Sequence, residues 1–63
     1  MLDDLKHILT TRTLRRFEQY DWNGLTYVRV FIVGQKDFAW DGLRTSEAML
    51  MLDAANRKQR SGR

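Results

Sequence analysis

The sequence has no cysteine and a single histidine, His7, in 63 residues. Disulfide bonds are therefore excluded, and so is a structural zinc site built from cysteine and histidine ligands. A domain this small buries only about 60% of the surface of its unfolded chain, so such domains commonly rely on disulfides, a metal or oligomerisation. We expect very good packing or association of copies to stabilise this fold. The absence of cysteine also fits a reducing compartment.

Long apolar runs are also missing. No segment approaches the roughly 18 residues of a membrane helix. The first residues, MLDDLKHILTT, are acidic early and interrupted by charge, which is unlike a signal peptide. We therefore expect a soluble, cytoplasmic protein without a membrane partner. Its formal net charge of +3 and its pI of about 9.8 are mildly basic, which is compatible with a nucleic-acid partner.

No catalytic constellation is recognisable. The carboxylates are dispersed, and no glycine-rich loop has the spacing that cradles a phosphate. Asp3, Asp4 and His7 fall on the polar side of an expected first helix, where pairing on a solvated face accounts for them without a metal. No spacing pairs Ser46 with His7 as nucleophile and base. The sequence therefore predicts a protein that is not an enzyme and that has no metal or cofactor.

Two helices are expected, one at each end of the chain. Apolar residues at helical spacing predict the first over residues 1–11, and Thr10, Thr11 and Thr13 then favour extended chain. The last helix is expected to be capped by Thr45 or Ser46 and to continue to residue 60. Residues 61–63 are expected to form a disordered tail.

The clearest local signal is Asn23-Gly24, which lies between two runs of strand-forming residues. It predicts a two-residue type I′ hairpin, since both central residues need a positive φ. The second strand is expected over residues 25–33, a turn over residues 34–37 and a short third strand over residues 38–40. The predicted fold class is α+β. Its order is αβββα, a three-stranded antiparallel meander with two helices packed on one face, and residues 1–60 form a single domain.

Strand alternation sorts the residues of this meander onto two apolar faces. The hairpin register puts Val28, Val30 and Ile32 on an aliphatic face, where we expect the helices to pack. A turn of even length adds Phe38 and Trp40 to the other, aromatic face, and a turn of odd length adds them to the aliphatic face. The aromatic face also places Glu18 opposite Arg29 as a cross-strand ion pair. The alternative, in which the helices cover the aromatic face, stays open. The aromatic face holds Arg16, Glu18, Tyr20, Trp22, Leu25, Tyr27, Arg29, Phe31 and Val33.

Whichever face the helices cover, a partly apolar face is left for a partner. Rings interleaved with arginines are typical of both single-stranded nucleic-acid platforms and protein hot spots. Basic residues near the end of the last helix are suited to phosphate contacts or to a solubilising helix end. The candidate partner-binding residues are Arg16, Tyr20, Tyr27, Arg29, Phe31, Trp40, Arg57, Lys58 and Arg60. The first expectation is a DNA- or RNA-binding module, and the alternative is an inhibitor or adaptor that blocks a host protein through the aromatic face.

The consecutive apolar run from Met49 to Leu52 wraps around the last helix, so part of it cannot face one sheet. A small helix enclosed by its neighbours would explain it, and so would a helix–helix contact in a homodimer, where flexible methionines suit an adaptable surface.

The predicted αβββα order resembles the double-stranded-RNA-binding domain. Gly34-x-Lys36-x-Phe38 and Ser46-x-Ala48 are similar to parts of that family's strand and final-helix pattern. Glu47-Ala48 stands where the family has a lysine pair, and the family's histidine in the first hairpin loop is absent.

Residues 27–55 also resemble three-strand-plus-helix DNA-binding domains, those of plant ethylene-response factors and of phage integrase arm-binding domains. That resemblance implies that Tyr27, Arg29, Phe31 and Trp40 face the major groove. In size, the chain is similar to the small inhibitors that phages encode.

Overall fold

The computed structural model describes residues 2–61, with side chains through Gln59. Helix α1 (Leu2–Thr11) leads into strand β1 (Leu14–Trp22). Strands β2 (Leu25–Ile32) and β3 (Trp40–Leu43) follow, and helix α2 (Ser46–Ser61) ends the described chain. The strands form one antiparallel sheet in the order β1-β2-β3. The predicted α+β fold with the order αβββα is confirmed.

The β1–β2 hairpin has the predicted turn and register. Asn23 and Gly24 have φ angles of 53° and 77°, the positive values that a type I′ turn requires. Counting outward from this turn, Trp22 pairs with Leu25 and Tyr20 with Tyr27. A β-bulge between Leu14 and Arg16 then shifts the register at the start of β1. The two turn residues, Asn23 and Gly24, therefore determine on which face of the sheet each side chain of the paired part of β1 and β2 lies.

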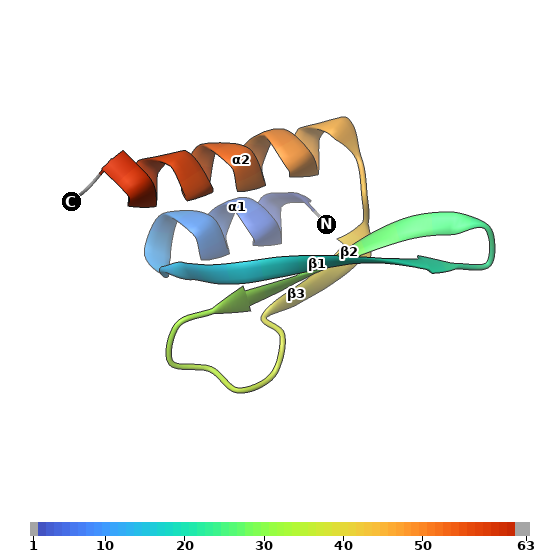
Figure 1. The fold of residues 1–63 in the computed structure, drawn as a ribbon, viewed down its shortest axis with the longest axis horizontal. Helices are drawn as coiled ribbons and strands as arrows, with labels where there is room; N and C mark the ends of the chain where they lie inside the picture. The colour runs from blue at the N-terminus through green and yellow to red at the C-terminus, as the bar shows by residue number, and fades with distance from the viewer. Residues whose placement is uncertain (1, 62–63) are drawn as a thin grey trace.

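The two helices lie side by side on one face of the sheet and run in the same direction (Figure 1). The covered face is the aliphatic one, so the alternative in which the helices cover the aromatic face is wrong. The tip of the β1–β2 hairpin projects beyond the helices, so the sheet is bare on both sides there (Figure 1). The buried residues between the helices and the sheet are Leu5, Leu14, Val28, Val30, Ile32, Ala48 and Leu52.

Helix α1 ends at Thr11, as predicted, and the hydroxyls of Thr10 and Thr11 donate to backbone carbonyls of the preceding turn, at Lys6 and His7. The predicted cap of α2 is confirmed, since Thr45 Oγ1 accepts a 3.2 Å hydrogen bond from the N–H of Ala48. Helix α2 includes Ser61, which the sequence placed in the disordered tail; the rest of that predicted tail lies outside the described residues.

The third strand is displaced from its predicted position. It begins at Trp40 and not at residue 38, because the connection after β2 covers residues 33–39 and contains an irregular turn at Gly34 (φ 87°). This connection has an odd length, and Trp40 pairs with Val30. Trp40 therefore lies on the covered, aliphatic face and packs against the core. Its expected place on the aromatic face is wrong, whereas Phe38 in the connecting loop does reach the aromatic side, near Arg29.

A side chain that the sequence analysis did not single out joins α2 to the sheet. The amide of Gln59 accepts a 2.7 Å hydrogen bond from the backbone N–H of Leu14 and donates a 2.8 Å bond to the Leu14 carbonyl. Both backbone groups lie where the bulge interrupts the β1–β2 ladder. The amide thus takes the place that a neighbouring strand would occupy.

Gly42 is required by the packing of Trp40. A Cβ atom at Gly42 would lie 2.5 Å from Cη2 of the Trp40 ring, a distance that real side chains do not reach. We expect Gly42→Ala to displace this ring and to lower the free energy of unfolding by about 1–3 kcal/mol in urea denaturation. In a Trp40→Ala background the same substitution should cost far less. Equal costs in the two backgrounds would show that the ring and the glycine are not coupled.

Candidate functional site

The face of the sheet opposite the helices is open, and we call it the open face. Neighbouring strands place ring, apolar and charged side chains together on it, as the register requires. Trp22, at 61% exposure, is the most exposed aromatic side chain among the large hydrophobic residues of the described chain. Leu25, Phe38 and Leu43 are also exposed. The open face consists of Arg16, Glu18, Tyr20, Trp22, Leu25, Tyr27, Arg29, Phe31, Asp41 and Leu43, with Phe38 from the connecting loop.

Three rings at the hairpin end of this face contact one another. Tyr20 and Tyr27 are directly opposite in the register, and their rings stack with centroids 5.6 Å apart and planes 20° apart. Trp22 meets Tyr27 edge to face at 6.0 Å. These are favoured geometries for aromatic pairs, so the rings hold one another in place on the surface. Tyr27 contacts both of the others and is the centre of this cluster.

Two arginines lie over rings of the same face. The guanidinium of Arg16 is 4.0 Å from the centroid of Phe31, and that of Arg29 is 4.4 Å from the centroid of Tyr20. The Arg29 guanidinium is also 5.4 Å from the Phe38 ring. Cation–π contacts at exposed sites contribute modestly, about 0.5–1 kcal/mol, but they fix where each charge lies. The predicted interleaving of arginines with rings on one face is confirmed for Arg16, Tyr20, Tyr27, Arg29 and Phe31.

Asp41, which is not among the residues predicted from the sequence, joins this arrangement from β3. Its carboxylate accepts a 2.6 Å hydrogen bond from the Tyr20 hydroxyl and lies 3.3 Å from Nε of Arg29. The predicted ion pair between Glu18 and Arg29 does not form, although the two residues are opposite each other. Arg29 turns to Asp41 on the other neighbouring strand, and Glu18 pairs with Arg16.

The charges of the open face are therefore matched within the chain. Arg16 pairs with Glu18 and Arg29 with Asp41, so two cations face two anions. The hydrogen bond to Asp41 raises the pKa of Tyr20, and the same carboxylate raises the pKa of Arg29. Exposed pairs of this kind add little stability. Their effect is to make the face electrically neutral and its polar groups preorganised.

The Asp41–Tyr20 bond can be tested by titration. In a Tyr27→Phe background Tyr20 is the single remaining tyrosine, and Asp41→Asn should lower its pKa toward the ordinary value of about 10 by removing the main cause of the increase. The folded state holds the Tyr20 proton more tightly than the unfolded chain does. The stabilisation that this hydrogen bond provides is therefore fully present below pH ~10 and is lost as the pH rises through the pKa of Tyr20 in the folded state. Ultraviolet absorbance of the tyrosinate measures the midpoint, and an unchanged midpoint in Asp41→Asn would rule out the bond.

The remaining candidate residues lie away from the open face. Trp40 is on the covered face. Arg57 and Lys58 are on α2, in the helix layer, and the side chain of Arg60 is outside the described part of the chain. Lys58 lines a hollow with Arg12, because both helices end at the same end of the molecule. The structure thus brings Arg12 and Lys58 together at that end, apart from the ring cluster.

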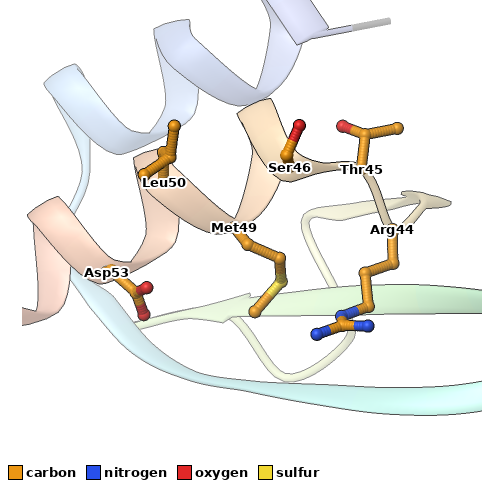
Figure 2. A pocket seen from close by; sticks show the side chains of 6 residues that line it. All are labelled: Arg44, Thr45, Ser46, Met49, Leu50 and Asp53. Atoms are coloured by element: carbon orange, nitrogen blue, oxygen red, sulfur yellow. The ribbon is translucent and has the colours of Figure 1, made fainter.

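One hollow lies on the open face and is lined by Tyr20, Trp22, Tyr27, Arg29, Asp41 and Gly42. The remaining hollows are shallow, and none of them gathers a recognisable catalytic set of side chains. The one at the start of α2 is lined by the preceding loop and the first turns of the helix (Figure 2). Its charged groups are Arg44 and Asp53, and its lining has no histidine. Within residues 2–61, no three histidine, cysteine, aspartate or glutamate side chains gather as a metal site would require.

No helix in the described chain is long and apolar enough to span a membrane. The resemblances to RNA- and DNA-binding domains stay predictions made from the sequence. Comparison of the chain with protein-family models, with curated proteins and with solved structures found no match.

Proposed function

We propose that this chain is a small, non-enzymatic module that binds a partner protein through the open face. The observation that supports this most is the uncovered cluster of Tyr20, Trp22 and Tyr27, bordered by Leu25 and Leu43. Tyrosine, tryptophan and arginine are the residues that most often dominate binding energy in protein interfaces. A small domain gains nothing in its own stability from leaving such a patch in water.

The charge pattern of the open face favours a protein partner over a nucleic acid. Phosphate contacts need cations in excess, and here both arginines lie beside carboxylates of the same face. A base that stacked on Tyr20 or Phe31 would also have to displace an arginine or a second ring. A protein interface buries its central residues. Rings that already contact one another, and charges that already pair within the chain, can be buried in this way without leaving an unpaired charge.

The experiment is a capture assay with the immobilised protein. The captured material is washed at about 1 M salt, where the Debye length falls to ~3 Å and binding that depends on exposed charges is screened. A partner protein should stay bound to the wild type and to Leu50→Ala, which changes an exposed residue of the helix layer. It should be lost from Tyr27→Ala. A partner retained equally by all three proteins would exclude the open face as its site.

Nucleic-acid binding is the second candidate, and a different observation supports it. Arg12 and Lys58 line one hollow, and Lys6 lines an adjoining one with Lys58, so cations gather where the two helices end. Binding there should weaken steeply with salt and should be reduced by Lys58→Glu but not by Tyr27→Ala. If DNA and RNA panels show no binding at low salt, this second candidate is eliminated.

A further inference from the structure

The outer edge of β1 is the longest exposed edge of the sheet. β1 pairs with β2 on one side and is the last strand on the other. It has nine residues, whereas β3 at the opposite edge has four. Helices α1 and α2 cover a face of the sheet (Figure 1), and α2 reaches the edge of β1 at Leu14, through the Gln59 amide. An edge of this length presents a row of backbone donors and acceptors to any strand that approaches.

The hairpin turn determines which backbone groups point outward. In a two-residue hairpin the residues that flank the turn form a hydrogen-bonded pair, and such pairs then alternate along the ladder. Trp22, Tyr20 and Glu18 therefore bond to β2, and the backbone groups of Asp21, Gln19 and Phe17 point outward. At the start of the strand, the Gln59 amide already bonds to Leu14 as a neighbouring strand would.

We propose that a second copy of this chain pairs with this edge, β1 against β1 and antiparallel, about a two-fold axis at Phe17. The charges along β1 support a second copy over an unrelated strand. The first part of the strand is basic, with Arg15 and Arg16, and the later part carries Glu18 and Asp21. An antiparallel copy brings the basic part of each strand beside the acidic part of the other.

The register about Phe17 makes this complementarity specific. It places Arg16 of each copy directly opposite Glu18 of the other, on the open side of the sheet. The Arg16–Glu18 pair that each chain already holds thus joins its counterpart in a network of four charges, with two ion pairs across the axis. The outward N–H and C=O of Phe17 exchange two hydrogen bonds across the axis. The two sheets become one sheet of six strands, with all four helices on one side. The two open faces then merge into one surface, so a protein bound there would meet both copies.

The test is a pair of charge reversals, measured on the protein alone by sedimentation equilibrium. In Arg16→Glu both residues of the pair are acidic, and in Glu18→Arg both are basic, so each variant places like charges opposite each other across the axis. We expect each to self-associate about 30-fold more weakly than the wild type. An equal mixture of the two variants restores opposite charges at both positions and should dimerise as the wild type does. Lys36→Glu, which reverses a charge in the 33–39 loop away from this edge, is the matched control.

This experiment uses the protein alone, without a partner protein. Its result therefore does not depend on whether the proposed function is correct. The proposal is overturned if the wild type stays monomeric at about 1 mM. It also fails if the single variants associate as well as the wild type, or if their mixture associates no better than either alone. Should a variant fail to fold, amide hydrogen exchange of the wild type decides. The N–H of Phe17 should be protected at high concentration and exchange quickly on dilution, and fast exchange at every concentration would reject the pairing.

Discussion

Leu52→Ala should remove a large part of the stability of this protein, while Leu50→Ala should change it very little. The two leucines are two positions apart on α2. Leu52 is 0% exposed and lies in the core cluster, and Leu50 is 67% exposed. A buried Leu→Ala change costs about 2–5 kcal/mol through lost burial and the cavity left behind. A surface change away from special features stays within about 0.5 kcal/mol.

Because the chain is small, the loss expected for Leu52→Ala is a large fraction of its total stability. At about 0.05–0.15 kcal/mol per residue, a domain of 63 residues has a total stability of roughly 3–9 kcal/mol. Loss of the Leu52 side chain therefore removes a large share of the total stability. Urea denaturation followed by circular dichroism measures both variants. Similar losses for Leu50→Ala and Leu52→Ala would mean that α2 is buried on both sides, in conflict with the single helix layer described above.

Tyr27→Ala should weaken binding of the partner protein by about 2 kcal/mol or more, which is ~30-fold in Kd. Tyr27 lies at the centre of the ring cluster and contacts both Tyr20 and Trp22. Its removal takes away one ring and releases the two others from their fixed positions. Because loss of a cross-strand pair costs only about 0.2–1 kcal/mol, the variant should remain folded.

Tyr27→Phe is the matched control for this substitution. It keeps the ring and both ring contacts and removes the hydroxyl, so its affinity should stay within a few-fold of the wild type. Isothermal titration calorimetry on the captured partner gives both values. Equal affinities for Tyr27→Ala and the wild type would place the binding surface elsewhere on the molecule.

The strands that the hairpin organises could be predicted from the sequence because their geometry is local. Asn23-Gly24 requires one turn type, and that turn determines every pairing out to Phe17 and Val30. The aliphatic run of β2 then indicated the face that the helices cover. Element order, the core side of β2 and the open position of Tyr20, Tyr27 and Phe31 all follow from that single turn.

The third strand could not be placed in the same way, because the turn before it carries no comparable signal. Its length is set by an irregular connection around Gly34, and a change of one residue moves every later side chain to the other face. An even-length turn therefore places Trp40 on the wrong side and hides Asp41 as the partner of Arg29. Opposite charges at Arg29 and Asp41 were the one signal that favoured the correct register.

The bond between Gln59 and Leu14 joins residues 45 positions apart, and nothing in the local sequence indicates it. Glutamine near the end of a helix is usually read as a solvated residue. The amide is needed there because β1 is an edge strand, so the N–H and C=O of Leu14 beside the bulge have no further strand to bond to. Contacts of this type depend on the packing of whole elements, and a single sequence does not predict them.

The most direct test of the account is solvent paramagnetic relaxation of side-chain signals with a neutral gadolinium chelate. We expect strong relaxation of the ring protons of Trp22 and Tyr27 on the open face, and almost none for the methyl groups of Val28 and Val30 beneath the helices. Strong relaxation of those valine methyls, or rings as protected as the valines are, would contradict a sheet that carries its helices on one face and exposes its aromatic side chains on the other.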